Sequence, residues 1–246
     1  MLNFWEETPF LFKMKIAGFQ KITLIDYPSK VSCIIFLWGC NFRCGFCYNP
    51  DLVIREKEEE FSKKEILKFL EKRKDKLEAV CITGGEPLLS IEENFLKEIK
   101  KLGYLIKIDT NGSYPEKLKD LIKKNLVDYI AMDIKASREN YPKVTGIKVN
   151  LNKIEESIKI VYEFGEYEFR TTVVPRFHNE KEIEEIGKWV NKICNGKPKK
   201  HFLQGFKNKG NFIDDKFKKE KEVEEKFLKR LKKIDEEYFE NGEVRI

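Results

Sequence analysis

The sequence has little of what exported, membrane-bound or nucleic-acid-binding proteins usually carry. The N-terminal stretch MLNFWEETPFLFK is acidic and lacks a basic start before a long apolar run, so it does not resemble a signal peptide. The apolar run CIIFLW is far too short to cross a bilayer. The 48 Lys and Arg residues are interleaved with 42 Asp and Glu residues, which is typical of solvated helix surfaces and not of a basic nucleic-acid-binding block. We therefore expect neither a membrane nor a nucleic acid among the partners.

Cysteine is also scarce for a protein stabilised by disulfides. There are six cysteines in 246 residues, and Cys33, Cys81 and Cys194 are scattered through expected strands or a helix. Such isolated thiols usually pack as small hydrophobic side chains. This usage favours a reducing compartment and a cytoplasmic location.

The length is sufficient for one large domain, and no second domain is required. Met14 is an alternative first residue. We expect one domain with three parts: an N-terminal extension (1–14), a core (15–206) and a C-terminal helical segment (207–246).

Short apolar segments alternate with amphipathic helical segments, which is the pattern of an α/β fold with a parallel sheet and crossover helices. Ser62 and Glu65 form a capping box before one helix, and Pro115 suits the first turn of another. The expected strands are 31–39, 79–83, 104–110, 128–134, 168–174 and 200–206. The expected helices lie within 62–77, 92–102, 115–124, 153–164, 180–193 and 217–235.

Unusual polar residues follow the first four of these strands. In parallel β/α architectures the loops after the strand ends share one face, and active sites form there. We therefore expect these residues to converge. They are Cys40, Cys44 and Cys47; Gly84, Gly85 and Glu86; Asp109, Thr110 and Asn111; and Asp133 and Lys135.

The stretch GCNFRCGFCYNP (39–50) spaces three cysteines as Cys-x-x-x-Cys-x-x-Cys. Three thiolates on a four-iron cluster leave one iron without a protein ligand, where a small molecule can coordinate. A zinc site would normally need a fourth Cys or His, and this loop has no His. Three structural cysteines that are close by chance are the other alternative. The spacing favours the open cluster.

With the aromatic Phe46 directly before the last cysteine, this motif resembles the signature of radical S-adenosylmethionine (radical SAM) enzymes. The resemblance runs from GFQKITLIDYPSK to HFLQGF and is strongest to activating enzymes of glycyl-radical enzymes. GFQKITLIDYP, GCNFRCGFCYNPDLV, TGGEPLL, IDTNG, MDIKA and FRTTVVP are most similar to the activator of anaerobic ribonucleoside-triphosphate reductase. The resemblance implies that the whole chain is one radical SAM domain, a partial (β/α)6-type barrel of parallel strands.

The resemblance also implies cofactors and partners. A [4Fe-4S] cluster on Cys40, Cys44 and Cys47 would donate one electron to S-adenosylmethionine, and cleavage would give methionine and a deoxyadenosyl radical. That radical would abstract hydrogen from a glycine of the partner, here the anaerobic reductase. A low-potential donor such as ferredoxin or flavodoxin would supply the electron.

Other readings remain open at this point. Within the same chemistry they are an activase of the pyruvate formate-lyase type and a radical SAM enzyme that acts on a small molecule. From other classes they are an iron–sulfur electron carrier and a zinc-binding module. The TGGEP and MDIK segments argue against the last two, because neither needs a cradle for S-adenosylmethionine.

For the cofactor-binding residues the resemblance gives specific roles. Gly84 and Gly85 would let the backbone approach the methionyl amino group, and Glu86 would accept from it. Asp133 and Lys135 share a face of an extended segment and would bind the ribose and the carboxylate. The full expected set is Phe46, Cys47, Tyr48, Gly84, Gly85, Glu86, Asp109, Thr110, Asn111, Asp133, Ile134, Lys135 and Thr172.

Three expectations concern single sites. Asp109, Thr110 and Asn111 match a polar turn near the ribose that could also hold a monovalent cation, although an ordinary Asn-Gly turn explains the same residues. Phe46 and Thr172 match positions near the adenine. Asp26 lies where related activators carry an Asp-Gly-Pro-Gly segment close to the partner, and we treat it as a candidate substrate-face residue.

Overall fold

An eight-stranded sheet organises the chain in the computed structural model, which describes residues 13–54 and 60–245. The strands lie in the sheet in the order in which they follow one another in the chain. β1 is antiparallel to β2, and every later neighbouring pair is parallel. The strands are β1 (Ile16–Tyr27), β2 (Lys30–Leu37), β3 (Ala79–Gly84), β4 (Leu105–Thr110), β5 (Tyr129–Asp133), β6 (Tyr167–Val173), β7 (Lys200–Gly205) and β8 (Asn241–Arg245).

The α/β class and the six expected strands are confirmed as β2 to β7, and the sheet is an open barrel, because β1 and β8 are its two edges. The sequence did not indicate these two edge strands. β1 is exposed along much of its length, including Ile22 at 60% and Ile25 at 86%, so it lacks the alternation that marks a half-buried strand. β8 is short and largely polar. The sheet is therefore wider than expected, and β1 breaks its parallel order.

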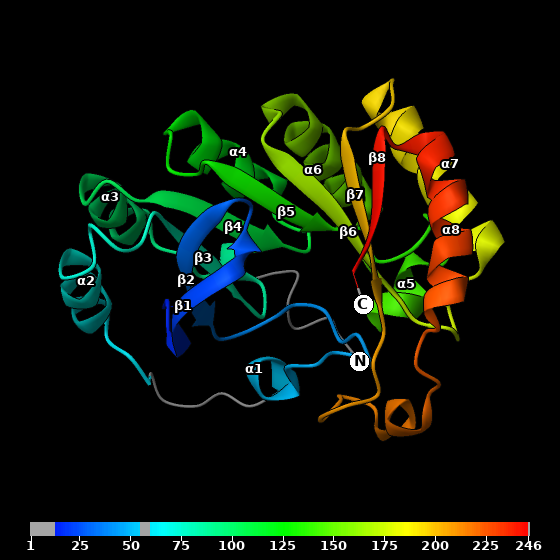
Figure 1. Cartoon of the computed structure of the whole chain (residues 1–246), viewed down its shortest axis with the longest axis horizontal. Coiled ribbons are helices and arrows are strands. Elements are labelled where there is room, and N and C mark those ends of the chain that lie inside the picture. Colours follow the sequence, from blue (N-terminus) through cyan, green and yellow to red (C-terminus); the bar gives the residue numbers. More distant parts are fainter. Residues whose placement is uncertain (1–12, 55–59, 246) are drawn as a thin grey trace.

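Helices cover the outer, convex face of the sheet in an arc (Figure 1). Ser62 and Glu65 form the expected capping box, in which the Ser62 N–H donates to Glu65 Oε2 at 2.8 Å. No helix within residues 13–54 and 60–245 is long and apolar enough to cross a membrane. The helices are α1 (Pro50–Ile54), α2 (Lys63–Glu71), α3 (Glu93–Lys101), α4 (Pro115–Lys123), α5 (Tyr141–Thr145), α6 (Leu151–Phe164), α7 (Glu180–Cys194) and α8 (Glu225–Tyr238), with short 3₁₀ turns η1 (Pro87–Leu89) and η2 (Asp215–Lys219).

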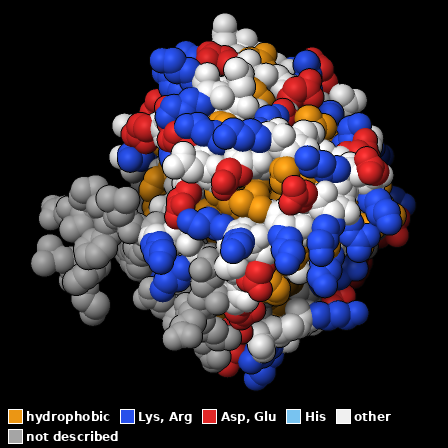
Figure 2. All heavy atoms as spheres, turned by 90° about the vertical axis from the view of Figure 1, so that its left-hand side faces the viewer, with side chains coloured by type: hydrophobic (Ala, Val, Ile, Leu, Met, Phe, Trp, Pro, Cys, Tyr) orange, Lys and Arg blue, Asp and Glu red, His pale blue; other side chains and the backbone are white. Residues whose placement is uncertain are grey.

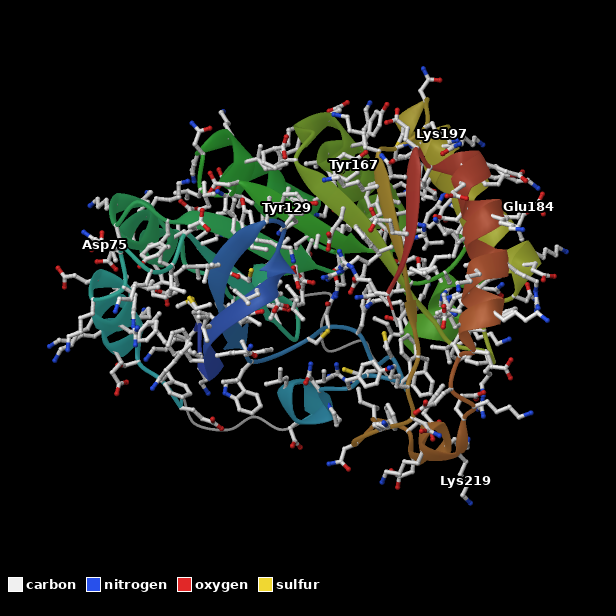
Figure 3. The ribbon with its side chains drawn as sticks, viewed as in Figure 1. Asp75, Tyr129, Tyr167, Glu184, Lys197 and Lys219 are labelled. Atoms are coloured by element: carbon white, nitrogen blue, oxygen red, sulfur yellow. The ribbon has the colours of Figure 1, made fainter. Side chains whose placement is uncertain are left out.

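The two faces of the sheet differ in chemistry because side chains alternate along each strand. Ile106 and Ile108 of β4 point outward into the main core beneath the helices. Lys107 and Asp109 of the same strand point to the inner side, where Lys107 is only 2% exposed. Tyr129 of β5 also lies on the inner side and packs on Tyr27 with ring centres 5.7 Å apart (Figure 3). The inner side is thus polar at one end and aromatic at the other.

The C-terminal part joins the barrel through α8 and β8, and it also reaches back to the cysteine loop. The segment between β7 and α8 runs past residues 40–47, where the Asp214 N–H donates to the Gly45 carbonyl at 3.0 Å. Lys219, farther along this segment, lies at the outside of the molecule (Figure 3). Of the expected N-terminal extension, residues 1–12 lie outside the described residues, and Met14 is buried in the core.

Acidic and basic side chains are intermixed over the face that Figure 2 shows. This agrees with the interleaving of charges along the sequence. The cysteines outside the loop, Cys33, Cys81 and Cys194, are buried as expected, and none of the six cysteines forms a disulfide.

Candidate active site

A cavity of about 200 Å³ lies at the carboxyl ends of the strands, between the cysteine loop and the inner side of the sheet. Three of the residues expected from the sequence do not line it: Glu86, Ile134 and Asp26. The expected residues that do are Cys40, Cys44, Phe46, Cys47, Tyr48, Gly84, Gly85, Asp109, Thr110, Asn111, Asp133, Lys135 and Thr172.

The three cysteines of the loop line this cavity, and contacts within the loop hold its backbone. The Cys47 N–H donates to the Cys44 carbonyl at 3.0 Å and closes a tight turn between the last two thiols. The Arg43 guanidinium donates to the carbonyls of Cys40 and Phe42 at 2.6 and 2.8 Å. The Phe42 N–H lies 3.4 Å from the Cys40 sulfur. Contacts within the loop therefore stabilise its conformation, and its three cysteines border one cavity.

The donor set that lines the cavity contains three thiols from one loop. Three thiolates fit a four-iron cluster with one iron left open to a small molecule. Burial raises the pKa of Cys40 to about 12 and that of Cys44 to about 11, so a cation is needed to displace these protons.

Gly84 and Gly85 bring the end of β3 into direct contact with the chain that leads into the cysteine loop. Gly84 has φ +128°, and a β-carbon there would overlap the backbone of Leu37. A β-carbon on Gly85 would overlap the carbonyl oxygen of Gly39. The same oxygen accepts from the Glu86 N–H at 2.7 Å. The glycines are thus required by protein packing, in addition to any approach of a ligand.

Glu86 is completely buried and points into the protein instead of the cavity. Its carboxylate accepts from the Leu88 N–H at 3.0 Å, the Thr110 hydroxyl at 2.8 Å and the Asn111 N–H at 2.6 Å. Burial raises its pKa to about 7, although these three donors act in the opposite direction. In this arrangement Glu86 fixes the loop after β4 against the loop after β3, and its oxygens are already satisfied by the protein.

The inner side of the sheet supplies a connected row of charges. Arg170 on β6 donates to Asp133 at 2.9 Å and to Asp109 at 3.1 Å. Asp133 also pairs with Lys135 at 2.8 Å, and Asp109 pairs with Lys107 at 2.5 Å. Burial alone would raise the pKa of Asp133, but Arg170 and Lys135 outweigh it and hold that pKa at about 2. The wall therefore presents two ionised carboxylates and the Lys135 ammonium.

Asn111 connects this wall to the cysteine loop. Its side-chain amide donates to Asn41 Oδ1 at 2.9 Å and lies 3.9 Å from the Cys40 sulfur. The side-chain oxygen of Asn111, Oδ1, accepts from the Ser113 N–H at 3.0 Å. The polar turn after β4 thus lies against the first cysteine.

Aromatic rings form the opposite wall. Tyr48 stacks on Phe206 with centres 5.9 Å apart, and its hydroxyl accepts from the Lys207 N–H at 2.7 Å. Phe46 is buried against Phe217, at 5.9 Å. Phe206, Phe217 and the cavity-lining Ile213 come from the segment between β7 and α8. The C-terminal part therefore contributes to the site, which the sequence did not indicate.

His178 holds the backbone beside Lys135. The Val174 N–H donates to its Nδ1 at 3.0 Å, and its Nε2 lies 3.0 Å from the Lys135 carbonyl. Burial lowers the pKa of His178, so the neutral ring accepts at Nδ1 and donates from Nε2. The structure gives this residue a positioning contact that its place in the sequence did not reveal.

His201 lies on the outer face of the sheet and supports, through Thr171, the backbone of Ile134, the residue before Lys135. It pairs with Asp235 of α8 at 2.6 Å, and its other ring nitrogen lies 2.9 Å from the Thr171 hydroxyl. That hydroxyl donates to the Ile134 carbonyl at 2.7 Å. All of these side chains are buried, so α8 is coupled to the strand end that carries Asp133 and Lys135.

Sequence reasoning overlooked Arg170 and Lys107, although a signal was present. Each is a basic residue inside a predicted strand, two positions before Thr172 and Asp109 respectively. Side chains two apart share a face of a strand, so both could have been assigned to the inner side. Asp26, by contrast, lies near the end of β1, where it accepts from the Thr23 hydroxyl.

The chain matches the family model of the radical SAM superfamily over residues 34–190. A Methanocaldococcus jannaschii protein, provisionally named a glycyl-radical enzyme activating enzyme, is 33% identical over 95% of this chain and 96% of its own length. The pyruvate formate-lyase-activating enzyme of Clostridium pasteurianum is 29% identical over 74% of this chain and 76% of its own.

Solved structures agree at the level of the fold. A domain of a pyruvate-formate lyase-activating enzyme from Bacteroides vulgatus superimposes with a TM-score of 0.55 at 19% identity, over 69% of this chain and 99% of that chain. SuiB from Streptococcus suis, bound to S-adenosylmethionine, gives a TM-score of 0.59 at 19% identity over 84% of this chain. This chain spans about half (47%) of the SuiB chain.

Proposed function

The chain belongs to the radical SAM superfamily, and we propose that it activates a partner enzyme by placing a radical on a glycine of that partner. It is an enzyme of redox chemistry that uses a [4Fe-4S] cluster and S-adenosylmethionine. When both are bound, Cys40, Cys44 and Cys47 would hold the cluster, which would supply the one electron that cleaves S-adenosylmethionine, and a hydrogen atom would be taken from the glycine of the partner. The observation that carries the proposal is the cavity that three cysteine thiols share with the charged wall of the sheet.

Different residues of this chain would bind the cluster and S-adenosylmethionine. Cys40, Cys44 and Cys47 would hold three irons. Lys135 lies on the wall where its ammonium can pair with a carboxylate of the bound methionyl group, and Asp133 remains ionised to accept from ribose hydroxyls. Glu86 positions the two loops through its contacts with Thr110 and Asn111, and its contact with the methionyl amino group stays a prediction.

For the partner we propose anaerobic ribonucleoside-triphosphate reductase. The motifs GFQKITLIDYP and GCNFRCGFCYNPDLV support this choice. A pyruvate formate-lyase type of partner is the second candidate, which the Clostridium relative favours. In either case the partner would complete the enclosure that protects the radical from water.

The test is a comparison of partners under anaerobic conditions. The reconstituted protein is mixed with S-adenosylmethionine, dithionite and either the reductase or the formate-lyase of the same organism. We expect a glycyl-radical signal in electron paramagnetic resonance, stoichiometric deoxyadenosine and activity of the reductase. A glycyl-radical signal with the formate-lyase alone would mean that the partner is the formate-lyase and not the reductase. Cleavage without any protein radical would favour a small-molecule substrate, and no cleavage at all would refute the chemistry.

A further inference from the structure

We propose that the surface around a second cavity, beside the cysteine loop, is the docking site for the one-electron donor, an acidic protein that carries a flavin or an iron–sulfur cluster. The inference rests on the proposed function, because every cleavage consumes one electron: the donor is oxidised by one electron as it reduces the cluster, and the cluster is oxidised again as that electron cleaves S-adenosylmethionine. The donor must therefore come close to the three cysteines.

The second cavity has a volume of about 360 Å³, lies beside the cysteine loop and shares Phe42 with the active-site cavity. Three loop residues, Asn41, Phe42 and Arg43, form one wall. The remaining walls come from the start of α4 and from the chain that leads into α6: Ser113, Tyr114, Ile147, Lys148, Val149, Asn150 and Lys153. The loop is in direct backbone contact with that chain, since the Arg43 N–H donates to the Thr145 carbonyl at 2.9 Å.

A single layer of side chains separates the two cavities. Phe42 lines both of them and is only 3% exposed. Asn41 donates to Ser113 at 2.9 Å on the side of the second cavity and accepts from Asn111 at 2.9 Å. The Asn111 amide in turn lies 3.9 Å from the Cys40 sulfur. A group seated in the second cavity would thus be linked to a cluster ligand by two side-chain amides.

The charges of the two cavities differ. The active-site cavity balances Asp109 and Asp133 against Lys135 and Arg170. The lining of the second cavity contains Arg43, Lys148 and Lys153 and no Asp or Glu. Lys148 is exposed, and the Lys153 ammonium has the Glu116 carboxylate 3.6 Å away. A cationic surface of this kind recruits an acidic partner through faster association.

The two surfaces can be used at the same time. The active-site cavity has to receive S-adenosylmethionine and the glycine of the enzyme that is activated, so the donor needs another approach to the cluster. The second cavity provides this approach, because its lining has only Phe42 in common with that of the active-site cavity. Donor and substrate would therefore not compete.

Charge reversal tests the proposal. We compare Lys148→Glu/Lys153→Glu with the control Lys101→Glu/Lys123→Glu. The control gives the same change of charge at two exposed lysines, which lie at the ends of α3 and α4 and thus near the amino ends of the strands. Stopped-flow absorbance follows reduction of the cluster by a reduced acidic flavin protein, by a reduced acidic iron–sulfur protein and by dithionite. The first variant should be about tenfold slower with at least one protein donor at low salt, and the difference should shrink at about 0.5 M salt. The control should behave as the unchanged protein.

The donor that shows the salt-dependent loss identifies the class of partner. Equal rates for the two variants with both protein donors would overturn the docking site. If the first variant loses iron, Lys148→Ala/Lys153→Ala replaces it, because it adds no negative charge beside Glu116. Reduction by dithionite needs no docking site and therefore tests the proposed function separately. A cluster that dithionite reduces without cleavage of S-adenosylmethionine would contradict the proposed function and leave the docking result intact.

Discussion

The two sides of the active-site cavity are built in different ways. The cysteine side is a loop that close backbone contacts hold in place, with Gly85 directly against the carbonyl of Gly39. The opposite side is a set of charged side chains on strands, in which Arg170 bridges Asp109 and Asp133. A backbone contact of this kind cannot adjust to an added atom, whereas a shared ion pair can rearrange. We therefore expect changes on the first side to abolish cluster binding and changes on the second to spare it.

The largest effect should follow replacement of a cluster ligand. Cys40→Ala, Cys44→Ala or Cys47→Ala removes one of three thiolates, and an iron cluster with two protein ligands should not persist. Anaerobic reconstitution followed by iron and sulfide analysis should show loss of the cluster. Buried thiols outside the loop provide the control: the same change at Cys33, Cys81 or Cys194 should keep the iron content. Equal iron in both groups would disprove the ligand assignment.

Gly85→Val should have the next largest effect, because its side chain must displace Gly39 and with it the start of the cysteine loop. We expect a loss of more than about 3 kcal/mol in unfolding free energy and a reduced yield of cluster. Urea unfolding and iron analysis measure the two effects.

Gly103→Ala is the matched control for this prediction. Gly103 has a positive φ, +92°, unlike Gly85, and nothing lies within 4 Å of an added β-carbon there. It should cost about 1–2 kcal/mol from the backbone conformation alone and leave the cluster intact. A Gly85→Val protein with normal iron content would show that the loop adjusts more easily than the structure suggests.

The same contrast explains which parts of the molecule were predictable. The cysteine motif is local in sequence, so spacing alone located it, and short apolar runs located β2 to β7 because most of their residues are buried. The row of charges depends on which strands are neighbours, so the sequence could place Arg170 on the inner side but could not pair it with Asp109 and Asp133. The contact of Phe217 with Phe46 joins segments far apart in the chain and has no local signal.

Glu86 lies between the two sides and should give a pH-dependent effect. Its pKa is raised by burial from 4.5 to about 7, so between these values the folded protein keeps a proton that the unfolded chain has released. Its contribution to stability should therefore be fully present below pH 4.5 and decline by about 3 kcal/mol as the pH rises to 7. Glu86→Gln should remove this slope. Parallel stability curves from urea unfolding of both proteins would show that the three donors keep Glu86 ionised throughout.

The smallest effect should come from Lys135 on the charged side. Lys135→Met removes the ammonium that faces the cavity and keeps much of its apolar length, while Arg170 still pairs with Asp133. The cluster should therefore load normally, and S-adenosylmethionine should bind about tenfold more weakly because its carboxylate loses a charged partner. Titration of the reduced cluster, followed by electron paramagnetic resonance, measures this. Lys188→Met, on the outer helix α7, is the control. Unchanged affinity in Lys135→Met would assign the carboxylate to another group, and lost iron would mean that the two sides of the cavity are not independent.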